Sequence, residues 1–201
     1  MGLRDIFTGR HSVKGPAPDR LFAISTAYVT LETEHQIVPA GAAAIVFQAL
    51  ATSEFEATLK ETEEVVTATG NESGVSVSSE NDSFGYRWMV LHKPTEGGDS
   101  CVEDLAVGVN AVSGSIENAG HGERLLCAVF AFSDHRDVAK PQPVYFIYNY
   151  KRGSWYPFVP DTGHDQQRLT ERELQIKAQM GSELPIEPEI ERWFPLWGIP
   201  I

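Results

Sequence analysis

The chain has 201 residues, with 28 acidic and 16 basic side chains and a formal net charge of −12. Its 42% hydrophobic content is enough for a packed core and excludes disorder throughout, while its negative charge argues against general nucleic-acid binding. Only six of the bases are lysines. We interpret this acidic, lysine-poor composition as halophilic, because concentrated salt screens the repulsion between like charges.

The same composition predicts a cytoplasmic protein. No apolar run reaches the roughly 18 residues of a membrane span, and Asp5 interrupts the first apolar cluster where a signal peptide would be uninterrupted. Cys101 and Cys127 are the only cysteines, and we expect both to be free thiols in a reducing compartment. Contact with a membrane would be peripheral at most.

Composition divides the chain into three parts. Residues 1–20 form a basic N-terminal arm that ends in a linker with Gly15, Pro16 and Pro18, and this arm is either a frayed end or a short amphipathic segment. Residues 21–184 are expected to form the folded domain. Residues 185–201 form an apolar aromatic C-terminal tail.

The first elements expected in the domain are two strands. Ala27 to Leu31 and Ala42 to Leu50 are rich in apolar and β-branched side chains, and they flank a turn-like Pro39-Ala40-Gly41 sequence. This arrangement predicts a hairpin.

Three helices are predicted from capping boxes, in which a hydroxyl is followed three residues later by a carboxylate. The three pairs are Ser53 with Glu56, Ser100 with Glu103, and Thr170 with Glu173. A helical apolar stripe follows the first box at Phe55, Leu59, Thr62 and Val66, and the second at Val102, Leu105, Val109, Val112 and Ile116. Gly120 is expected to end the second helix.

The remaining strands are predicted from alternation and turn residues. Residues 75–78 and 84–92 read as one hairpin, and 144–150 with 154–159 as another, with Gly153 at the turn and Pro157 on an edge strand. The continuously apolar Leu125 to Phe132 predicts a central strand. The expected fold is α+β, a mainly antiparallel sheet of hairpins with about three capped amphipathic helices packed on it.

No catalytic, metal or cofactor motif is found in the sequence. The histidines lack metal-ligand spacing, so we expect neither a metal nor a cofactor. Cys127 lies in an apolar run and is predicted to be a buried thiol of high pKa. The loop from His121 to Arg124 could belong to an uncharacterised enzyme, but a helix C-cap followed by a turn explains its glycines without a ligand.

Two aromatic clusters are the candidate partner-binding sites. The first places Lys151 and Arg152 at a turn expected to face solvent, and the second is in the tail. The residues that we assign to partner binding are Lys151, Arg152, Trp155, Tyr156, Phe158, Trp193, Phe194 and Trp197. The alternative is that the hairpin rings fill the core and the tail packs across the sheet.

Four segments resemble the PspA-associated protein family PspAB. They are residues 1–7 (Met-Gly-Leu-Arg-Asp-Ile-Phe), 124–130 (Arg-Leu-Leu-Cys-Ala-Val-Phe), 150–158 (Tyr-Lys-Arg-Gly-Ser-Trp-Tyr-Pro-Phe) and 192–198 (Arg-Trp-Phe-Pro-Leu-Trp-Gly). The resemblance implies a haloarchaeal or actinobacterial protein of the phage-shock envelope-stress system. It also implies a link to the coiled-coil protein PspA and to the membrane protease HtpX.

Taken together, these observations predict a non-enzymatic accessory protein that contacts a PspA-like protein or an HtpX-type protease at the cytoplasmic face of the membrane. Two alternatives remain open, an enzyme that uses the His121–Arg124 loop and a structural subunit of a homo-oligomer.

Overall fold

The fold is built on a single antiparallel sheet. The computed structural model describes residues 18–82, 84–94 and 101–201. Its six strands have the order β2-β3-β1-β4-β5-β6, and every neighbouring pair is antiparallel. The strands are β1 (Ile37–Phe47), β2 (Ser76–Asn81), β3 (Arg87–His92), β4 (Leu125–Asp134), β5 (Gln142–Asn149) and β6 (Ser154–Phe158). The predicted α+β class is confirmed.

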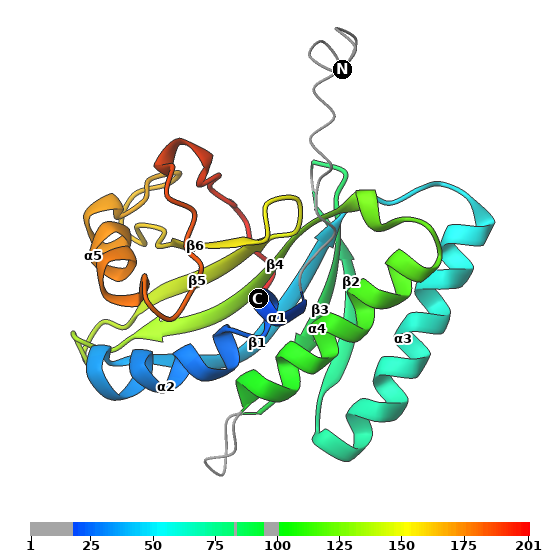
Figure 1. Cartoon of the computed structure of the whole chain (residues 1–201), viewed down its shortest axis with the longest axis horizontal. Coiled ribbons are helices and arrows are strands. Elements are labelled where there is room, and N and C mark those ends of the chain that lie inside the picture. Colours follow the sequence, from blue (N-terminus) through cyan, green and yellow to red (C-terminus); the bar gives the residue numbers. More distant parts are fainter. Residues whose placement is uncertain (1–17, 83, 95–100) are drawn as a thin grey trace, which may run out of the picture.

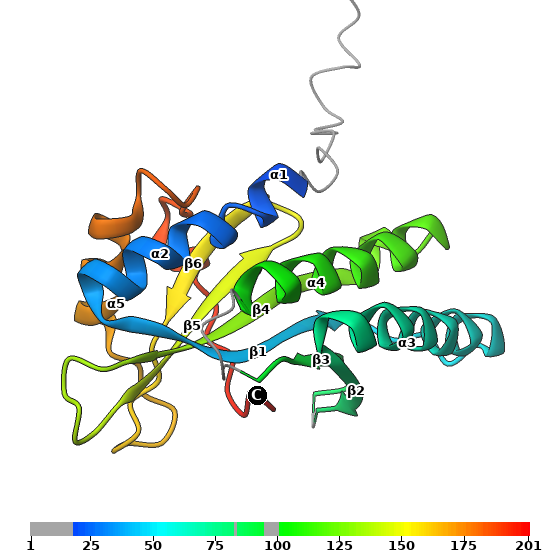
Figure 2. The ribbon, with the colours of Figure 1, turned by 90° about the horizontal axis from the view of Figure 1, so that it is seen from below.

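Helices cover one face of this sheet. They are α1 (Pro18–Leu21), α2 (Ile24–His35), α3 (Ser53–Ser73) and α4 (Cys101–Asn118), while α5 (Thr170–Met180) packs beside the β6 edge (Figure 1). Two 3-10 turns, Gly122–Arg124 and Ile190–Arg192, complete the elements. Figure 2 shows α2 and α4 on one side of β1 and the C-terminal segment on the other. None of the helices within the described ranges is long and apolar enough to cross a bilayer.

The central strands are buried on both faces. In β1, Ala43 and Ile45 pack in the main core under the helices, while Ala44 and Val46 belong to a second apolar cluster on the opposite face. β4 lies between β1 and β5 and alternates in the same way, which explains the continuously apolar sequence of the predicted central strand. That prediction is confirmed.

The first predicted hairpin is wrong. Ala27 to Leu31 lies within α2, whose buried residues Ile24, Ala27 and Leu31 are spaced at i, i+3 and i+7 and therefore share one helical face. The predicted turn at residues 39–41 lies inside β1. The register of β1 against β4 shifts between Pro39 and Ala43, and Gly41 has φ 73°, so the glycine serves a β-bulge in a long strand.

The two later hairpins are confirmed. β2 pairs with β3, and β5 pairs with β6 across a turn where Gly153 has φ 62°. β6 is at the end of the sheet, where Pro157 was expected. Cys101 and Cys127 are free and buried, and burial raises the pKa of Cys127 to about 12, as predicted from its apolar surroundings.

The predicted helices exist, although their caps differ. The apolar stripes of α3 and α4 are buried, and Gly120 (φ 83°) follows α4 in the left-handed conformation of a C-cap. At α3 the capping hydroxyl belongs to Thr52, which accepts a hydrogen bond from the Phe55 amide at 3.3 Å, one residue before the predicted Ser53. Ser100 lies outside the described residues. Thr170 does not cap α5, because its N-cap is Leu169.

The predicted domain bounds can be compared with the structure at the start of the folded domain and at the tail. The N-terminal arm lies outside the described residues as far as residue 17, and α1 begins at Pro18, three residues before the predicted start of the folded domain. The segment that follows α5 packs on the second face of the sheet, where Trp193, Leu196 and Trp197 join the second apolar cluster.

Two glycines of α4 provide a matched test of packing. A Cβ at Gly108 would overlap Cδ2 of the fully buried Leu91, whereas a Cβ at Gly114 would meet no atom within 4 Å. We expect Gly108→Ala to destabilise the fold by about 1–2 kcal/mol, since overpacking outweighs the gain in helix propensity. Gly114→Ala should instead stabilise it by up to about 1 kcal/mol. Urea unfolding measures both, and equal effects would contradict the tight α4–β3 contact.

Candidate partner-binding groove

The C-terminal tail covers the face of the sheet that the helices leave open. Trp193 is only 2% exposed and stacks on Tyr156, with ring centroids 6.3 Å apart. The Tyr156 hydroxyl donates to the Phe194 carbonyl at 3.0 Å, and burial raises the pKa of Tyr156, so this donor stays protonated. Trp197 packs edge-on against Phe158 at 5.1 Å. The tail is thus bound to its own sheet.

A buried carboxylate fixes the start of the tail. Glu187 is 5% exposed and accepts hydrogen bonds from Arg152 Nε at 2.7 Å and Ser154 Oγ at 3.2 Å. The backbone beside it bonds to the β6 edge, where the Trp155 amide donates to the Pro185 carbonyl at 2.9 Å and the Glu187 amide donates to the Trp155 carbonyl at 2.8 Å. The chain therefore leaves α5 and turns back along β6 in one defined path.

A second ion pair holds the tail further along. Glu173, in the first turn of α5, is fully buried and accepts a hydrogen bond from the Val159 amide at 2.9 Å and a bifurcated hydrogen bond from Arg168 Nε, at 2.9 and 2.8 Å. Arg168 in turn donates from Nη1 to the Trp193 carbonyl at 2.7 Å, and its guanidinium lies 5.4 Å from the Phe158 ring centroid. The predicted capping role of Glu173 is replaced by this role in anchoring Arg168.

An open apolar groove lies between the docked tail and the turn that joins β2 to β3. Its volume is about 530 Å³. Its lining includes Val46, Trp88, Leu126, Cys127 and Tyr156 from the sheet, Phe84 and Tyr86 from the turn, and Phe194, Pro195, Leu196 and Trp197 from the tail. Phe84 is 71% exposed and Phe194 is 60% exposed. Rings this exposed on both walls mark a surface suited to binding.

The wall made by the β2–β3 turn is held in place by Asp82. One carboxylate oxygen accepts the amides of Phe84 and Tyr86 at 2.8 and 2.9 Å, and the other accepts Trp88 Nε1 at 3.0 Å. Gly85, between the two rings, has φ 85°. The turn is therefore preorganised, which lowers the entropy lost when a ligand contacts its rings.

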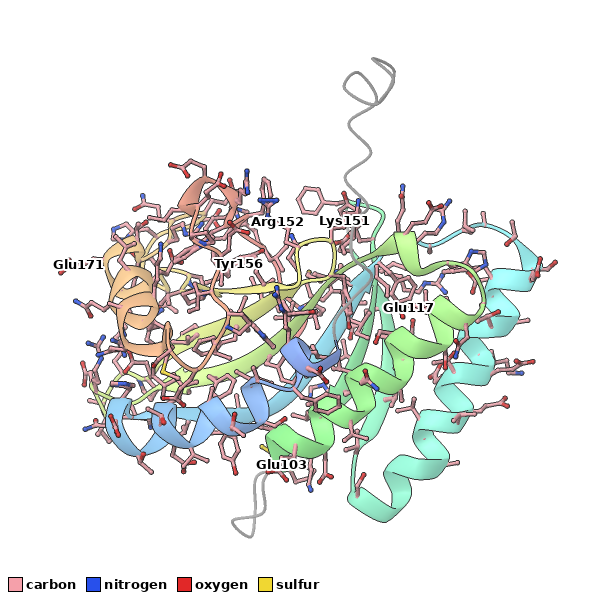
Figure 3. All side chains as sticks on the ribbon, in the orientation of Figure 1. Glu103, Glu117, Lys151, Arg152, Tyr156 and Glu171 are labelled. Carbon is pink, nitrogen blue, oxygen red and sulfur yellow. The ribbon has the colours of Figure 1, made fainter. Side chains whose placement is uncertain are left out.

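The structure separates the predicted partner-binding residues into two groups. Trp155 lies wholly within the main core, where its indole nitrogen donates to the Arg20 carbonyl at 2.7 Å, and Tyr156, Phe158 and Trp193 are buried in the second cluster. The burial of these four rings fits the alternative, in which the hairpin rings fill the core and the tail packs across the sheet. Phe194, Trp197 and Lys151 line the groove, as does the buried Tyr156, and Figure 3 shows Lys151 beside Arg152 at the β5–β6 turn.

Arg152 differs from the expectation of a free surface cation, because it neutralises Glu187. Phe84 and Tyr86 are groove residues that were not predicted, since alternation placed both in a strand. The sequence feature that could have indicated an exposed aromatic turn is the pair of aromatic residues on either side of a glycine, next to a polar turn.

The His121 loop has the geometry of a helix cap. The His121 amide donates to the Ile116 carbonyl at 2.9 Å, and its ring packs edge-on against Phe55 with centroids 4.9 Å apart. Among the residues that the structure describes, no group of three or more His, Cys, Asp or Glu side chains could hold a metal ion.

Fold and groove together define an α+β protein whose C-terminal tail forms part of a surface suited to binding. Comparison with family models identifies it further: the model for PspAB, PspA associated protein B, matches residues 1–201, the whole chain. The chain belongs to this family, as the resemblance of its four segments implied. Neither the comparison with curated proteins nor the comparison with solved structures found a match.

The paired cations at the β5–β6 turn predict unequal effects of substitution. Arg152→Gln removes the 2.7 Å ion pair of the buried Glu187 and leaves only Arg192, whose Nη1 is 3.8 Å away, so we expect a loss of about 1–2 kcal/mol in unfolding free energy. Lys151→Gln, one residue away and exposed, should change stability by less than about 0.5 kcal/mol. Chemical denaturation distinguishes the two variants, and equal stabilities would show that the Arg152–Glu187 pair is not needed.

The same pair predicts weaker tail docking in acid. Burial acts to raise the pKa of Glu187, but hydrogen bonds from Arg152, the Glu189 amide and Ser154 outweigh it and lower that pKa. The carboxylate therefore contributes stability above its unfolded pKa of about 4.3 and loses that contribution as pH falls through the folded value.

We expect the signal of Trp193, followed by near-ultraviolet circular dichroism, to weaken below about pH 4. The pKa of Asp134 is also lowered, so the wild type must be compared with Glu187→Gln. That variant should be less stable at neutral pH and less sensitive to acid, and identical acid profiles would contradict the role given to Glu187.

Proposed function

We propose that this protein is a non-enzymatic accessory protein of the phage-shock response and that it binds a PspA-like coiled-coil protein through the aromatic groove. The observation that carries the proposal is the open apolar groove between the tail and the β2–β3 turn, with strongly exposed rings on both walls. Membership in a family named for its association with PspA supports the choice of partner. The composition and the free thiols support a cytoplasmic location.

The form of the groove favours a helix as the bound element. An amphipathic helix binds by placing apolar side chains at i, i+3, i+4 and i+7 into an apolar groove, and a coiled-coil protein consists of such helices. Phe84 and Phe194 face such a helix from opposite walls. Aromatic anchors of this kind supply large contact areas with little loss of side-chain entropy.

Lys151 gives the groove a charge preference. It lines the groove in a chain of net charge −12, and its exposed ammonium group lies next to apolar walls. A partner helix with an acidic side chain beside its apolar stripe would pair with it, and this pairing would contribute to specificity and to the rate of association.

The docked tail argues against recruitment by a free C-terminal peptide. Its first ring, Trp193, is buried on the chain's own sheet, and Arg168 holds the carbonyl of the same residue. In the proposal the tail acts instead as a wall of the groove. An HtpX-type protease and a second copy of this chain are the competing occupants, and the test below distinguishes them.

Removing the two exposed groove rings should strongly weaken partner binding without loss of stability. In Phe84→Ser/Phe194→Ser we expect affinity for the purified PspA-like protein of the same organism to fall at least tenfold, because aromatic anchors dominate such interfaces. Val138→Ser serves as the control, since Val138 is 78% exposed on the β4–β5 loop and lies outside the groove. Calorimetric titration gives the affinities and thermal unfolding confirms the fold.

Three results would contradict the proposal. Equal binding by the double variant and the parent would remove the groove as the site. Binding to the cytoplasmic part of HtpX, but not to the PspA-like protein, would assign the groove to the protease. Concentration-dependent self-association that the double variant loses, with no binding to either protein, would make the groove a contact between copies of this chain.

A further inference from the structure

A polar cavity lies at the other end of β4 from the aromatic groove. The groove contacts β4 at Leu126 and Cys127, near its start, whereas this cavity is formed where β4 ends, at Asp134. Its volume is about 370 Å³. It is lined by Asp134 at the end of β4, by Arg136, Asp137 and Lys140 in the β4–β5 loop, by Gln142 at the start of β5, and by Leu169 and Arg172 at the start of α5.

Arg172 is the buried cation of this cavity. Its side chain is 7% exposed, and Nε donates to Asp134 Oδ2 at 2.8 Å. Nη1 makes a long contact of 3.4 Å with Gln175. Nη2 is buried and has no hydrogen-bond partner among the described residues. A buried guanidinium N–H without an acceptor is costly, so a ligand oxygen that reached Nη2 would be bound favourably there.

The one buried acid of the cavity is shared between two arginines. Arg136 donates from Nε to both oxygens of Asp134 at 3.1 Å, so Asp134 balances only one of the two guanidinium charges. Asp137 uses one oxygen to accept the Ala139 amide at 3.1 Å, and Lys140 adds a third base. Three bases against two acids leave the cavity positive within a chain of net charge −12.

The N-terminus of α5 adds to this positive potential. Leu169, the residue before the helix, and Arg172, in its first turn, both line the cavity, and no side-chain hydrogen bond caps the helix. The acids of the first turn do not compensate: Glu173 is bound to Arg168, and Glu171 is exposed and projects away from the molecule (Figure 3). Uncapped helix N-termini favour anions.

We infer that this cavity binds a phosphate group, held between the guanidinium groups of Arg136 and Arg172 at the start of α5, with Lys140 at the mouth. Arginine forks match the oxygens of phosphate, and the helix terminus supports its charge. The cavity is larger than inorganic phosphate, so the group would be carried by a small phosphate monoester or by a phospholipid headgroup. This inference does not depend on the aromatic groove.

In the alternative, the two arginines only neutralise the buried Asp134, and a water molecule bonds to Nη2 of Arg172. A structural cluster of this kind would respond to phosphate no more than a surface lysine does. The experiment therefore compares exposed bases inside and outside the cavity, because substitution of the buried Arg172 would disturb the fold.

The test titrates inorganic phosphate and glycerol 3-phosphate into the full chain by calorimetry at constant ionic strength. We expect saturable binding that weakens at least tenfold in Arg136→Gln/Lys140→Gln. Lys140→Gln alone, which leaves the Arg136–Asp134 pair in place, should weaken it severalfold. Lys60→Gln is the charge-matched control, since Lys60 is an exposed base on α3, and it should bind as the parent does.

A second arm uses vesicles of phosphatidylcholine with and without phosphatidate. Binding to phosphatidate vesicles that requires Arg136 and Lys140 assigns the headgroup as the source, whereas binding to the soluble phosphates alone assigns a small molecule. No saturable binding to any of these probes would overturn the inference. Equal binding by the cavity variants and by Lys60→Gln would also overturn it. The same holds if chloride displaces the bound phosphate as well as phosphate itself does.

Discussion

A sheet that is apolar on both faces needs two covers, and this requirement organises the whole structure. The helices cover one face, so the second cluster around Val46, Val129 and Ile147 would be exposed to water without the tail. The last part of the chain is therefore a structural element of the sheet. Residues 194–197 of the tail line the same groove as the β2–β3 turn, so the tail also forms a groove wall that no strand provides.

Two buried carboxylates determine where this cover lies. Glu187, held by Arg152, fixes the chain against β6, and Glu173, through Arg168, fixes the Trp193 carbonyl. Neither ion pair reaches the groove itself, but both position the backbone that carries Phe194 and Trp197. The stability of the tail and the geometry of the groove are thus coupled, and a change in either pair would alter the shape of the groove from outside it.

The sequence predicts the fold best where the pattern has one structural solution. Alternation around a polar turn predicted the β2–β3 hairpin, a glycine turn predicted the β5–β6 hairpin, and the uninterrupted apolar run of β4 indicated a central strand. The short run from Ala27 to Leu31 suits either a strand or a buried helix face, and packing under the main core decided for the helix. Gly41 looked like a turn because a bulge and a turn both require its positive φ.

For the candidate site, the sequence determined only which kinds of residue take part. Composition and resemblance indicated an aromatic, partner-binding member of the PspAB family, and Lys151, Phe194 and Trp197 do line the groove. Which rings are buried, that Arg152 neutralises Glu187, and that the β2–β3 turn faces the tail are contacts between segments far apart in the chain. Local periodicity carries no information about such contacts, because they depend on which surfaces the tertiary fold brings together.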